Sequence, residues 1–370
     1  MTQGMDGRNG PASDIARTRR RGRLGLFLPY VALAILVAAW SGAWFWIRGK
    51  AEHEMDAWMA REAAAGRTWA CQDRSLTGYP FRIELRCAAL TLTRSDGSFR
   101  LGPTTVVAQI YQPRLIVFES QGPFHAEQGA LTGDASWSAL QGSFHGASEG
   151  FTRLSLVVEG PKVSVAGAEP QPITVQGKHL ELHARPSPAR YESDGAVEVN
   201  LQLAQAAIPN LDALTGSAAP VDASLDTTIT RATVIGTGAV PRELETWRQA
   251  GGMLEIGALA FAKGDQRIQA RGQVALDEAH RPTGQIDLRA AGVDALIGSV
   301  VGQRFGSEKG ALVGQLVGGL LGLGRGAARA EEAPAGSGPP LKPLPPLKLV
   351  NGQVLFSGFP IPNVRIPPLY

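Results

Sequence analysis

The chain offers few side chains that could do chemistry, and the densest group lies in the segment His179-Leu180-Glu181-Leu182-His183. In a β-strand, side chains alternate between the two faces, so His179, Glu181 and His183 would share one face. Two imidazoles and a carboxylate are suitable metal ligands. The spacing differs from the helical H-E-x-x-H motif, however, and the two leucines supply an apolar opposite face. We therefore interpret the histidine face as a solvated polar face, with a metal site as the alternative.

A second pair of histidines ends a short repeat. Gln-Gly-Pro-Phe-His ends at His125 and Gln-Gly-Ser-Phe-His ends at His145, twenty residues later. Two strands of one meander could bring these imidazoles together, but no cysteine or carboxylate ligand is evident beside them. We predict no metal site. A periplasmic metal-dependent hydrolase that uses His125, His145, His179 or His183 is the alternative.

Recognised catalytic motifs are missing from the sequence. It contains no Walker loop, no G-x-S-x-G elbow and no C-x-x-C pair. Acidic residues occur singly, so no carboxylate pair is marked out for acid–base catalysis. We predict a protein that is not an enzyme, has no catalytic residues and needs no cofactor.

The segment Leu24 to Ile47 is uncharged over 24 residues, and five arginines precede it between Arg17 and Arg23. A helix rises about 1.5 Å per residue, so this segment is long enough to cross a hydrocarbon core of roughly 30 Å. Positive residues favour the cytoplasmic side. We therefore predict a single-pass protein of the bacterial inner membrane, with residues 1–23 cytoplasmic and the chain after Arg48 in the periplasm.

A cleaved signal peptide is the alternative to a retained anchor. Ser41-Gly42-Ala43 resembles a cleavage site, but the apolar run continues through Trp44, Phe45 and Trp46. Signal peptides have a shorter apolar core, and aromatic residues of this kind form interfacial belts. The residues after Arg19-Arg20 lack the hydrophobic pair of a twin-arginine signal. We favour the retained anchor.

The charge of the chain follows its predicted topology. The net charge is +3, and residues 1–23 hold six arginines and two aspartates, which leaves −1 for the rest. The basic character therefore belongs to the tail and is not a nucleic-acid-binding patch. We predict no nucleic-acid partner.

Cys71 and Cys87 are the two cysteines, and both follow the anchor. An oxidising compartment and an even count predict a disulfide. Closing a loop of this size would stabilise the fold by about 3 kcal/mol in the chain-entropy model. The alternative is two independent reduced thiols.

The hydrophobic pattern predicts one helix followed by many strands. Residues 48–66 have helical periodicity with a Met/Trp stripe and a C-terminal glycine, Gly66. From Thr68 the period changes to two. The expected strands are Phe81–Cys87, Leu90–Thr93, Thr104–Tyr111, Arg114–Glu119, Ala130–Trp137, Ser155–Val158, Ile173–His183, Ala196–Leu203, Thr227–Ile235, Met253–Phe261, Ile268–Leu276 and Gly284–Ala290.

These strands predict a mainly β (α+β) fold, an antiparallel meander or curved sheet with a few packed helices. Short strands separated by Gly, Pro, Asp and Ser favour antiparallel pairing, and no βαβ rhythm is present. The β-rich domain spans residues 67–295, with two candidate sub-blocks at 67–215 and 221–295. A short helix is expected near Arg242 to Gln249.

Residues 296–326 carry a glycine at every fourth position, eight in all. Small residues at this spacing let helices approach closely, although each glycine costs about 1 kcal/mol relative to alanine in a helix. Three interpretations stay open. We favour a helical hairpin packed on the sheet, and the alternatives are an interfacial or re-entrant membrane contact and a flexible linker.

The end of the chain has a different composition. Residues 327–346 are rich in Ala, Gly, Ser and Pro, which predicts an exposed linker. Residues 347–370 contain Asn351-Gly352 between two apolar runs, which predicts a hairpin, and then an extended polyproline-like tail.

Several motifs resemble those of a bacterial family of unknown function, DUF2125. They are Trp69-Ala70-Cys71, Gly78-Tyr79-Pro80-Phe81-Arg82, Cys87, Ala108-x-x-Tyr111-x-Pro113, Arg271–Asp277, Arg281–Gly284, Asn351–Val354 and Pro367-Pro368-Leu369. The resemblance implies an anchored envelope protein without an assigned reaction. At a looser level, an anchor followed by a long β-meander is similar to AsmA-like envelope proteins implicated in lipid movement.

These observations predict a non-enzymatic envelope protein with a structural, scaffolding or lipid-handling role. Its partners would be the inner membrane, through residues 24–47, and a lipid or another envelope protein. A continuous apolar groove on one sheet face would support lipid handling, whereas a closed, filled core would argue against it. The third hypothesis is an envelope partner-binding module that uses the glycine-rich segment or the proline-rich tail.

Overall fold

The computed structural model describes residues 24–148, 150–167, 171–292 and 340–370. The predicted cytoplasmic tail, the glycine-rich segment 296–326 and the linker up to residue 339 lie outside the described residues. The chain divides into two compact units, Met1–Ala51 and Glu52–Tyr370. The division falls within the first helix, α1 (Leu24–Ala64).

Helix α1 joins the predicted anchor to the predicted juxtamembrane helix without a break. Among the described residues, it is the one helix long and apolar enough to cross a membrane. The helix is followed by Gly66, whose φ of +79° is left-handed. The N–H of Arg67 then bonds to the carbonyl of Glu62 at 2.9 Å, as in a glycine-terminated helix.

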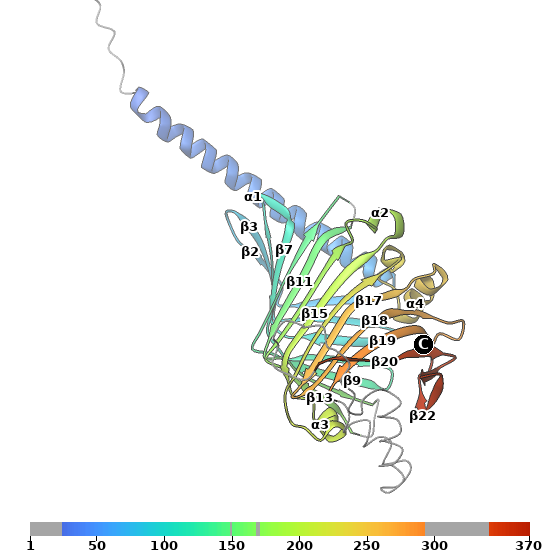
Figure 1. Ribbon diagram of the computed structural model, residues 1–370. Helices are drawn as coiled ribbons and strands as arrows, with labels where there is room; N and C mark the ends of the chain where they lie inside the picture. Colours follow the sequence, from blue (N-terminus) through green and yellow to red (C-terminus); the bar gives the residue numbers. More distant parts are fainter. Residues whose placement is uncertain (1–23, 149, 168–170, 293–339) are drawn as a thin grey trace, which may run out of the picture. The chain divides into compact units, whose positions relative to one another are not determined.

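The second unit contains two antiparallel sheets, which confirms the predicted fold class (Figure 1). Sheet A has seven strands in the order β1 (Thr68–Gln72), β4 (Ala89–Arg94), β5 (Gly97–Leu101), β8 (Phe124–Gln128), β9 (Leu131–Ser136), β12 (Lys162–Ala166) and β13 (Ile173–Gln176). Sheet B has fifteen strands in the order β2 (Ser75–Thr77), β3 (Arg82–Cys87), β6 (Thr104–Gln109), β7 (Gln112–Ser120), β10 (Ala139–Gly146), β11 (Phe151–Glu159), β14 (His179–Pro186), β15 (Val197–Ala206), β16 (Val221–Ile229), β17 (Leu254–Lys263), β18 (Gln266–Leu276), β19 (Pro282–Ala291), β20 (Lys342–Val350), β21 (Gln353–Phe356) and β22 (Phe359–Arg365).

Short helices interrupt the second half of sheet B. They are α2 (Tyr191–Asp194), α3 (Pro209–Thr215), the 3₁₀ turn η1 (Ala232–Val234) and α4 (Val240–Gln249). The last contains the helix that the sequence predicts near Arg242 to Gln249. Its Trp247 is buried and donates its indole N–H to the carbonyl of Thr230 at 2.7 Å.

The two sheets are the two halves of one meander that folds along a line. Strands β3 and β4 are separated by a single residue, Ala88, and β5 and β6 by Gly102-Pro103. Two or three residues separate the strands of five further pairs, which are β1 and β2, β7 and β8, β9 and β10, β11 and β12, and β13 and β14. Neighbours in sheet A are also neighbours in sheet B. Seven long strands therefore run through both sheets, and we call the line where they bend the crease.

Hydrogen bonds continue across the crease, where the strands change direction. The amide of Gly102 bonds to the carbonyl of Pro123 at 3.0 Å. The hydroxyls of Thr104 and Ser120 lie 3.0 Å apart, and both residues are buried. The indole of Trp137 donates to the carbonyl of Ser120 at 2.8 Å. Polar side chains thus satisfy backbone groups that a bent ladder would leave without partners.

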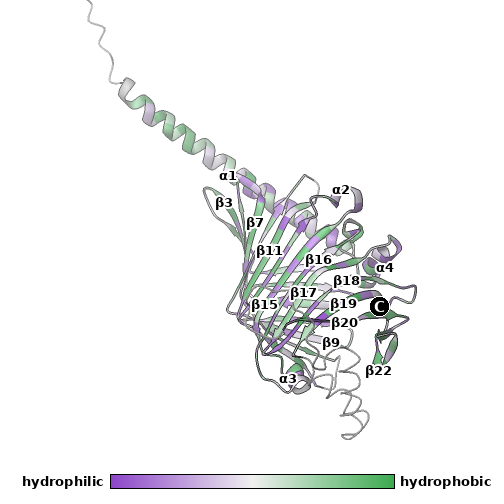
Figure 2. Ribbon diagram, viewed as in Figure 1, coloured by the Kyte–Doolittle hydropathy of each residue, from purple (hydrophilic) through white to green (hydrophobic). Residues whose placement is uncertain are grey.

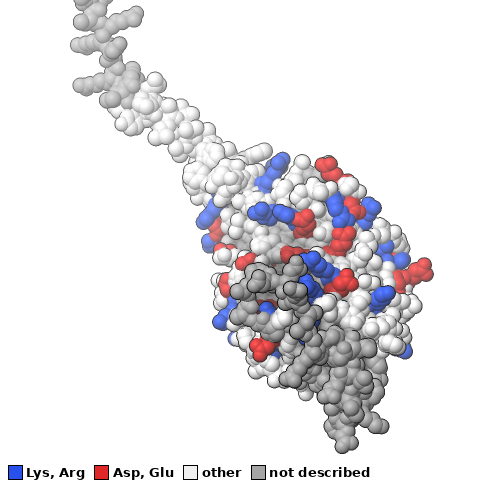
Figure 3. All heavy atoms as spheres, viewed as in Figure 1, with Lys and Arg blue, Asp and Glu red and all other residues white. Residues whose placement is uncertain are grey.

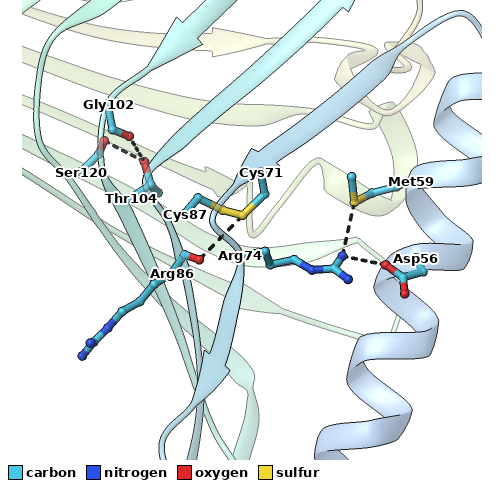
Figure 4. The surroundings of a disulfide bond; sticks show 9 residues. All are labelled: Asp56, Met59, Cys71, Arg74, Arg86, Cys87, Gly102, Thr104 and Ser120. Atoms are coloured by element: carbon cyan, nitrogen blue, oxygen red, sulfur yellow. Dashed lines mark hydrogen bonds and ion pairs between the residues drawn. A yellow bond between two sulfur atoms is a disulfide. The ribbon is translucent and has the colours of Figure 1, made fainter.

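The predicted disulfide is present, and it lies at the crease (Figure 4). Cys71 comes from β1 of sheet A and Cys87 from β3 of sheet B, with 5.1 Å between their Cα atoms. Nearby, Arg74 donates to the carboxylate of Asp56 in α1 at 2.6 Å. The disulfide therefore joins the two sheets next to the point where the helix meets them.

Two expectations need correction because strand pairing overrides local pattern. The single strand expected from Ile173 to His183 breaks at the crease into β13 and β14. The strand expected at Thr227–Ile235 runs instead from Val221 to Ile229. The two candidate sub-blocks stay a prediction, and the pairing of β15 with β16 places strands of both in sheet B.

The C-terminal region also has more strand than its composition indicates. The last residues of the expected linker, Lys342 to Pro346, begin β20. The expected proline-rich tail includes β22, which pairs with β21 at the edge of sheet B. Proline is tolerated there because an edge strand has one side without ladder partners. The expected hairpin at Asn351-Gly352 is present between β20 and β21.

The crease predicts that Gly102 cannot be replaced by a residue with a side chain without loss of stability. A Cβ there would lie 2.5 Å from the carbonyl oxygen of Gln121 and 2.8 Å from that of Gly122. We expect Gly102→Ala to lower the free energy of unfolding by about 2 kcal/mol through overpacking. Chemical denaturation of the two variants measures this, with Gly133→Ala as the control because its Cβ would meet nothing within 4 Å. Equal effects at the two positions would contradict this role of the crease.

Candidate functional site

The histidines of β14 form a hydrogen-bonded ladder on one face of sheet B. His179 contacts Glu159 through Nδ1 at 2.8 Å and Glu181 through Nε2 at 2.7 Å. His183 contacts the other oxygen of Glu181 at 3.2 Å and the hydroxyl of Ser155 at 3.0 Å. The face expected from the alternation therefore exists, and its imidazoles are occupied by neighbours on β11 and β14.

The carboxylates on both sides of His179 change its ionisation. Hydrogen bonds to Glu181 and then to Glu159 raise the pKa of His179 above its ordinary value. Hydrogen bonds from His179 and then from His183 lower the pKa of Glu181. Two acceptors on one imidazole fit the doubly protonated ring, which donates from both nitrogens.

The other two candidate histidines do not come together. His125 lies on β8 of sheet A, where it contacts Asp134 at 2.8 Å and Glu127 at 3.2 Å. These two carboxylates raise the pKa of His125. His145 lies on β10 of sheet B, opposite Leu115 and Arg153. Among the described residues, no group of three or more His, Cys, Asp or Glu side chains could hold a metal ion.

Sequence reasoning missed a buried ion pair. Lys263, at the end of β17, has no exposed side-chain surface, and its ammonium contacts Asp212 of α3 at 2.5 Å. The same ammonium donates to the carbonyl of Ala219 at 2.6 Å. The sequence contained a signal for this pair. Lys263 follows Leu259 and Phe261 at a spacing of two residues, so the three side chains share one face of β17. A lysine in such a position needs a buried partner.

The most extensive feature is an apolar row that crosses sheet B. One residue from each of twelve successive strands, β3 to β20, stands opposite the next in register. The row is Leu85, Val106, Phe118, Gly142, Leu156, Leu182, Leu201, Leu225, Leu259, Ala270, Leu288 and Leu344. At about 4.8 Å between strands, it is roughly 50 Å long.

This apolar face of sheet B is not filled like a protein core. Gly142 and Ala270 are the buried members of the row, and the larger members are all partly exposed. The largest fully buried side chains of the described residues are Lys263 and Val221. In a closed β-sandwich, large apolar side chains from two faces interdigitate and exclude water. The alternation of apolar and polar residues is visible along the strands in Figure 2.

Among the described strands, none of sheet A is joined through the crease to the second half of sheet B. Strands β15 to β22 belong to sheet B alone, because sheet A ends at β13. In sheet A, an aromatic row runs from Trp69 through Phe99 to Phe124, with neighbouring ring centroids 5.7 and 5.8 Å apart. Trp58 of α1 packs on Trp69 at 5.6 Å. The predicted Met/Trp stripe of the helix therefore contacts an apolar row of sheet A.

The charged surface is mixed. In the view of Figure 3, acidic and basic side chains are interspersed over the visible described residues of the second unit. This distribution agrees with the near-zero charge of the chain after its basic tail.

Comparison with known proteins identifies a family and no activity. The model of a family described as uncharacterized protein conserved in bacteria (DUF2125) matches residues 44–365. No curated protein and no solved structure shows a significant match to the chain.

The His179 ladder predicts a pH-dependent contribution to stability. A raised pKa in the folded state means that the contribution is complete below the unfolded value of about 6.5 and is lost as pH rises through the folded value. We expect His179→Gln to lower the melting temperature at pH 5.5 more than at pH 9. Thermal unfolding across this range measures the difference, and Glu181→Gln should weaken the same pH dependence. A pH-independent effect of His179→Gln would contradict the ladder.

The buried pair predicts a non-additive response. Asp212→Ala leaves the Lys263 charge without its carboxylate, and we expect the free energy of unfolding to fall by about 3 kcal/mol. Adding Lys263→Met removes the buried charge and should restore most of the loss. Arg94→Ala, which breaks the pair with Asp96, is the control and should cost less than about 1 kcal/mol. A double variant as unstable as Asp212→Ala alone would refute the explanation.

Proposed function

This chain belongs to the DUF2125 family of uncharacterized proteins conserved in bacteria, and from its own geometry we propose that it is a membrane-anchored, non-enzymatic lipid-handling protein of the bacterial envelope. Helix α1 spans the inner membrane through residues 24–47. The basic tail is cytoplasmic, and the β-rich unit is periplasmic. The apolar face of sheet B shields the acyl chains of a lipid from water.

The observation that carries the proposal is the apolar row together with its partial exposure. The row is continuous over twelve strands, and its leucines keep contact with solvent. Exposed apolar surface costs roughly 25 cal/mol per Å². Soluble proteins therefore rarely leave such an area uncovered unless it binds something apolar. At roughly 50 Å, the face is long enough to hold extended acyl chains.

The apolar helix supports the choice of ligand. A unit attached to a helix that is long and apolar enough to cross a membrane stays close to lipid at high effective concentration. Partial exposure of the large row members also differs from the dense packing expected of a purely structural β-sandwich.

The metal-dependent hydrolase has less support. It requires several ligands around one point, and among the described residues no such group is found. His179 and His183 are already bonded to carboxylates and to Ser155. An envelope partner-binding module, expected to use the glycine-rich segment or the proline-rich tail, does not require lipid on the apolar face, and one experiment distinguishes the two hypotheses.

Site-specific photocrosslinking in cells tests the proposal. Leu225 lies on the apolar face, and the adjacent Ser224 faces the other side of the same strand, β16. We expect a photoreactive amino acid at Leu225 to form lipid adducts, detected by mass spectrometry, and the same amino acid at Ser224 to form none.

Other outcomes have clear meanings. Protein adducts at Leu225 in place of lipid would favour the partner-binding module. Lipid adducts at both positions, or at neither, would refute lipid handling on this face. The melting temperatures of the two variants provide the control for folding.

A further inference from the structure

The polar face of sheet B contains a hollow of about 540 Å³ over strands β11, β14, β15, β16 and β17. Arg153, Ser155, His183, Arg185, Asn200 and Thr228 are among the residues that line it. These side chains lie on the side of the sheet opposite to the apolar row, because alternate residues of a strand point to opposite faces. The hollow is therefore separate from the proposed lipid-binding face.

Two arginines are neighbours in this hollow. Leu154 pairs with Ala184, so Arg153 on β11 stands across from Arg185 on β14. Like charges directly opposite each other in a sheet are destabilising. Glu198 neutralises Arg185 through contacts of 2.9 and 2.8 Å. Arg153 is exposed, and its side chain makes no hydrogen bond or ion pair among the described residues.

The acidic groups of the hollow are already occupied. Glu198 accepts hydrogen bonds from Arg185 and from the hydroxyl of Ser187 at 2.9 Å. Asp226 accepts one from the amide of Asn200 at 2.5 Å. Ser155 and Thr228 add hydroxyl groups to the lining. The guanidinium of Arg153 is thus the one cation of the described lining without an anionic neighbour bound to it.

Two shifts in strand register occur at residues that line the hollow or lie next to them. The register shifts between Asp226 and Thr227 on β16 and between Ile256 and Leu259 on β17. Gly257 lies in the second irregularity, and a Cβ there would meet one atom, the carbonyl oxygen of Asp226, at 3.6 Å. Close packing therefore does not require glycine at this position. Its absent side chain keeps the hollow open, and β-bulges are frequent beside binding sites.

We propose that this hollow binds a phosphate group, with the guanidinium of Arg153 as its principal ligand. A guanidinium can donate two parallel hydrogen bonds to a phosphate, which gives strong and directional recognition. The hydroxyl of Thr228 supplies a further donor, and the phosphate neutralises the charge of Arg153. The phosphate comes either from a small soluble ligand or from a lipid headgroup.

Two binding measurements on the full-length chain in zwitterionic nanodiscs test the site. In the first, equilibrium dialysis measures the dissociation constant of radiolabelled inorganic phosphate. In the second, co-flotation measures attachment to phosphatidylglycerol vesicles, with phosphatidylcholine vesicles as the reference. We compare the original chain with Arg153→Ala, Gly257→Leu and Arg289→Ala. Arg289 is an exposed arginine on the polar side of β19 without a partner among the described residues, so its variant is the matched control.

We expect Arg153→Ala and Gly257→Leu to weaken binding by about tenfold or more, and Arg289→Ala to leave it unchanged. Loss in the dialysis measurement supports the site with a soluble phosphate, and loss in co-flotation supports it with a lipid headgroup. If the original chain binds neither probe, or if Arg153→Ala binds both like the original chain, the site is refuted. Equal losses in Arg153→Ala and Arg289→Ala also refute it, because they indicate general charge attraction. Arg153→Ala decides the result if Gly257→Leu does not fold.

Discussion

The structure depends on maintaining strand pairing through a bend. Seven long strands change direction at the crease, and each keeps the same neighbours before and after it. A bend in an antiparallel ladder removes backbone hydrogen bonds unless other groups replace them. The hydroxyl of Thr104 donates to the carbonyl of Gly102, and the indole of Trp137 donates to the carbonyl of Ser120. The amide of Gly102 keeps a backbone bond to the carbonyl of Pro123. The disulfide at the same line links the two halves covalently.

The bend also determines which residues face each other. Alternation along each strand resumes on the far side of the crease, so sheet A and sheet B both have one apolar face and one polar face. Beyond β14 the described strands all belong to sheet B, and the apolar row continues through them to β20. A long apolar face with little full burial is the result, and it motivates the proposal of lipid handling.

The surroundings of each charged group determine how its charge is stabilised. On the solvated face, the carboxylates that contact His179 are partly exposed, and they stabilise its charged form. Inside the unit, Lys263 is fully enclosed and needs both Asp212 and a backbone carbonyl. Arg153 differs from both because none of the printed contacts of the described residues pairs its guanidinium with a carboxylate, whereas the neighbouring Arg185 is paired with Glu198. Arg153 is therefore a candidate ligand-binding residue, whereas His179 and Lys263 have partners within the fold.

Short-range features of the sequence determined much of this protein. An uncharged run behind arginines, alternation of apolar and polar residues, a glycine after the first helix and Asn351-Gly352 each act within a few residues, so they predict the helix, the antiparallel strands and the hairpin. Only the tertiary structure decided the position of the crease, which divides Ile173–His183. It also decided the ion pair of Lys263 with Asp212 and the placement of Arg153 across from Arg185. These depend on residues far apart in the chain, or on register between strands, and local periodicity contains no information about either.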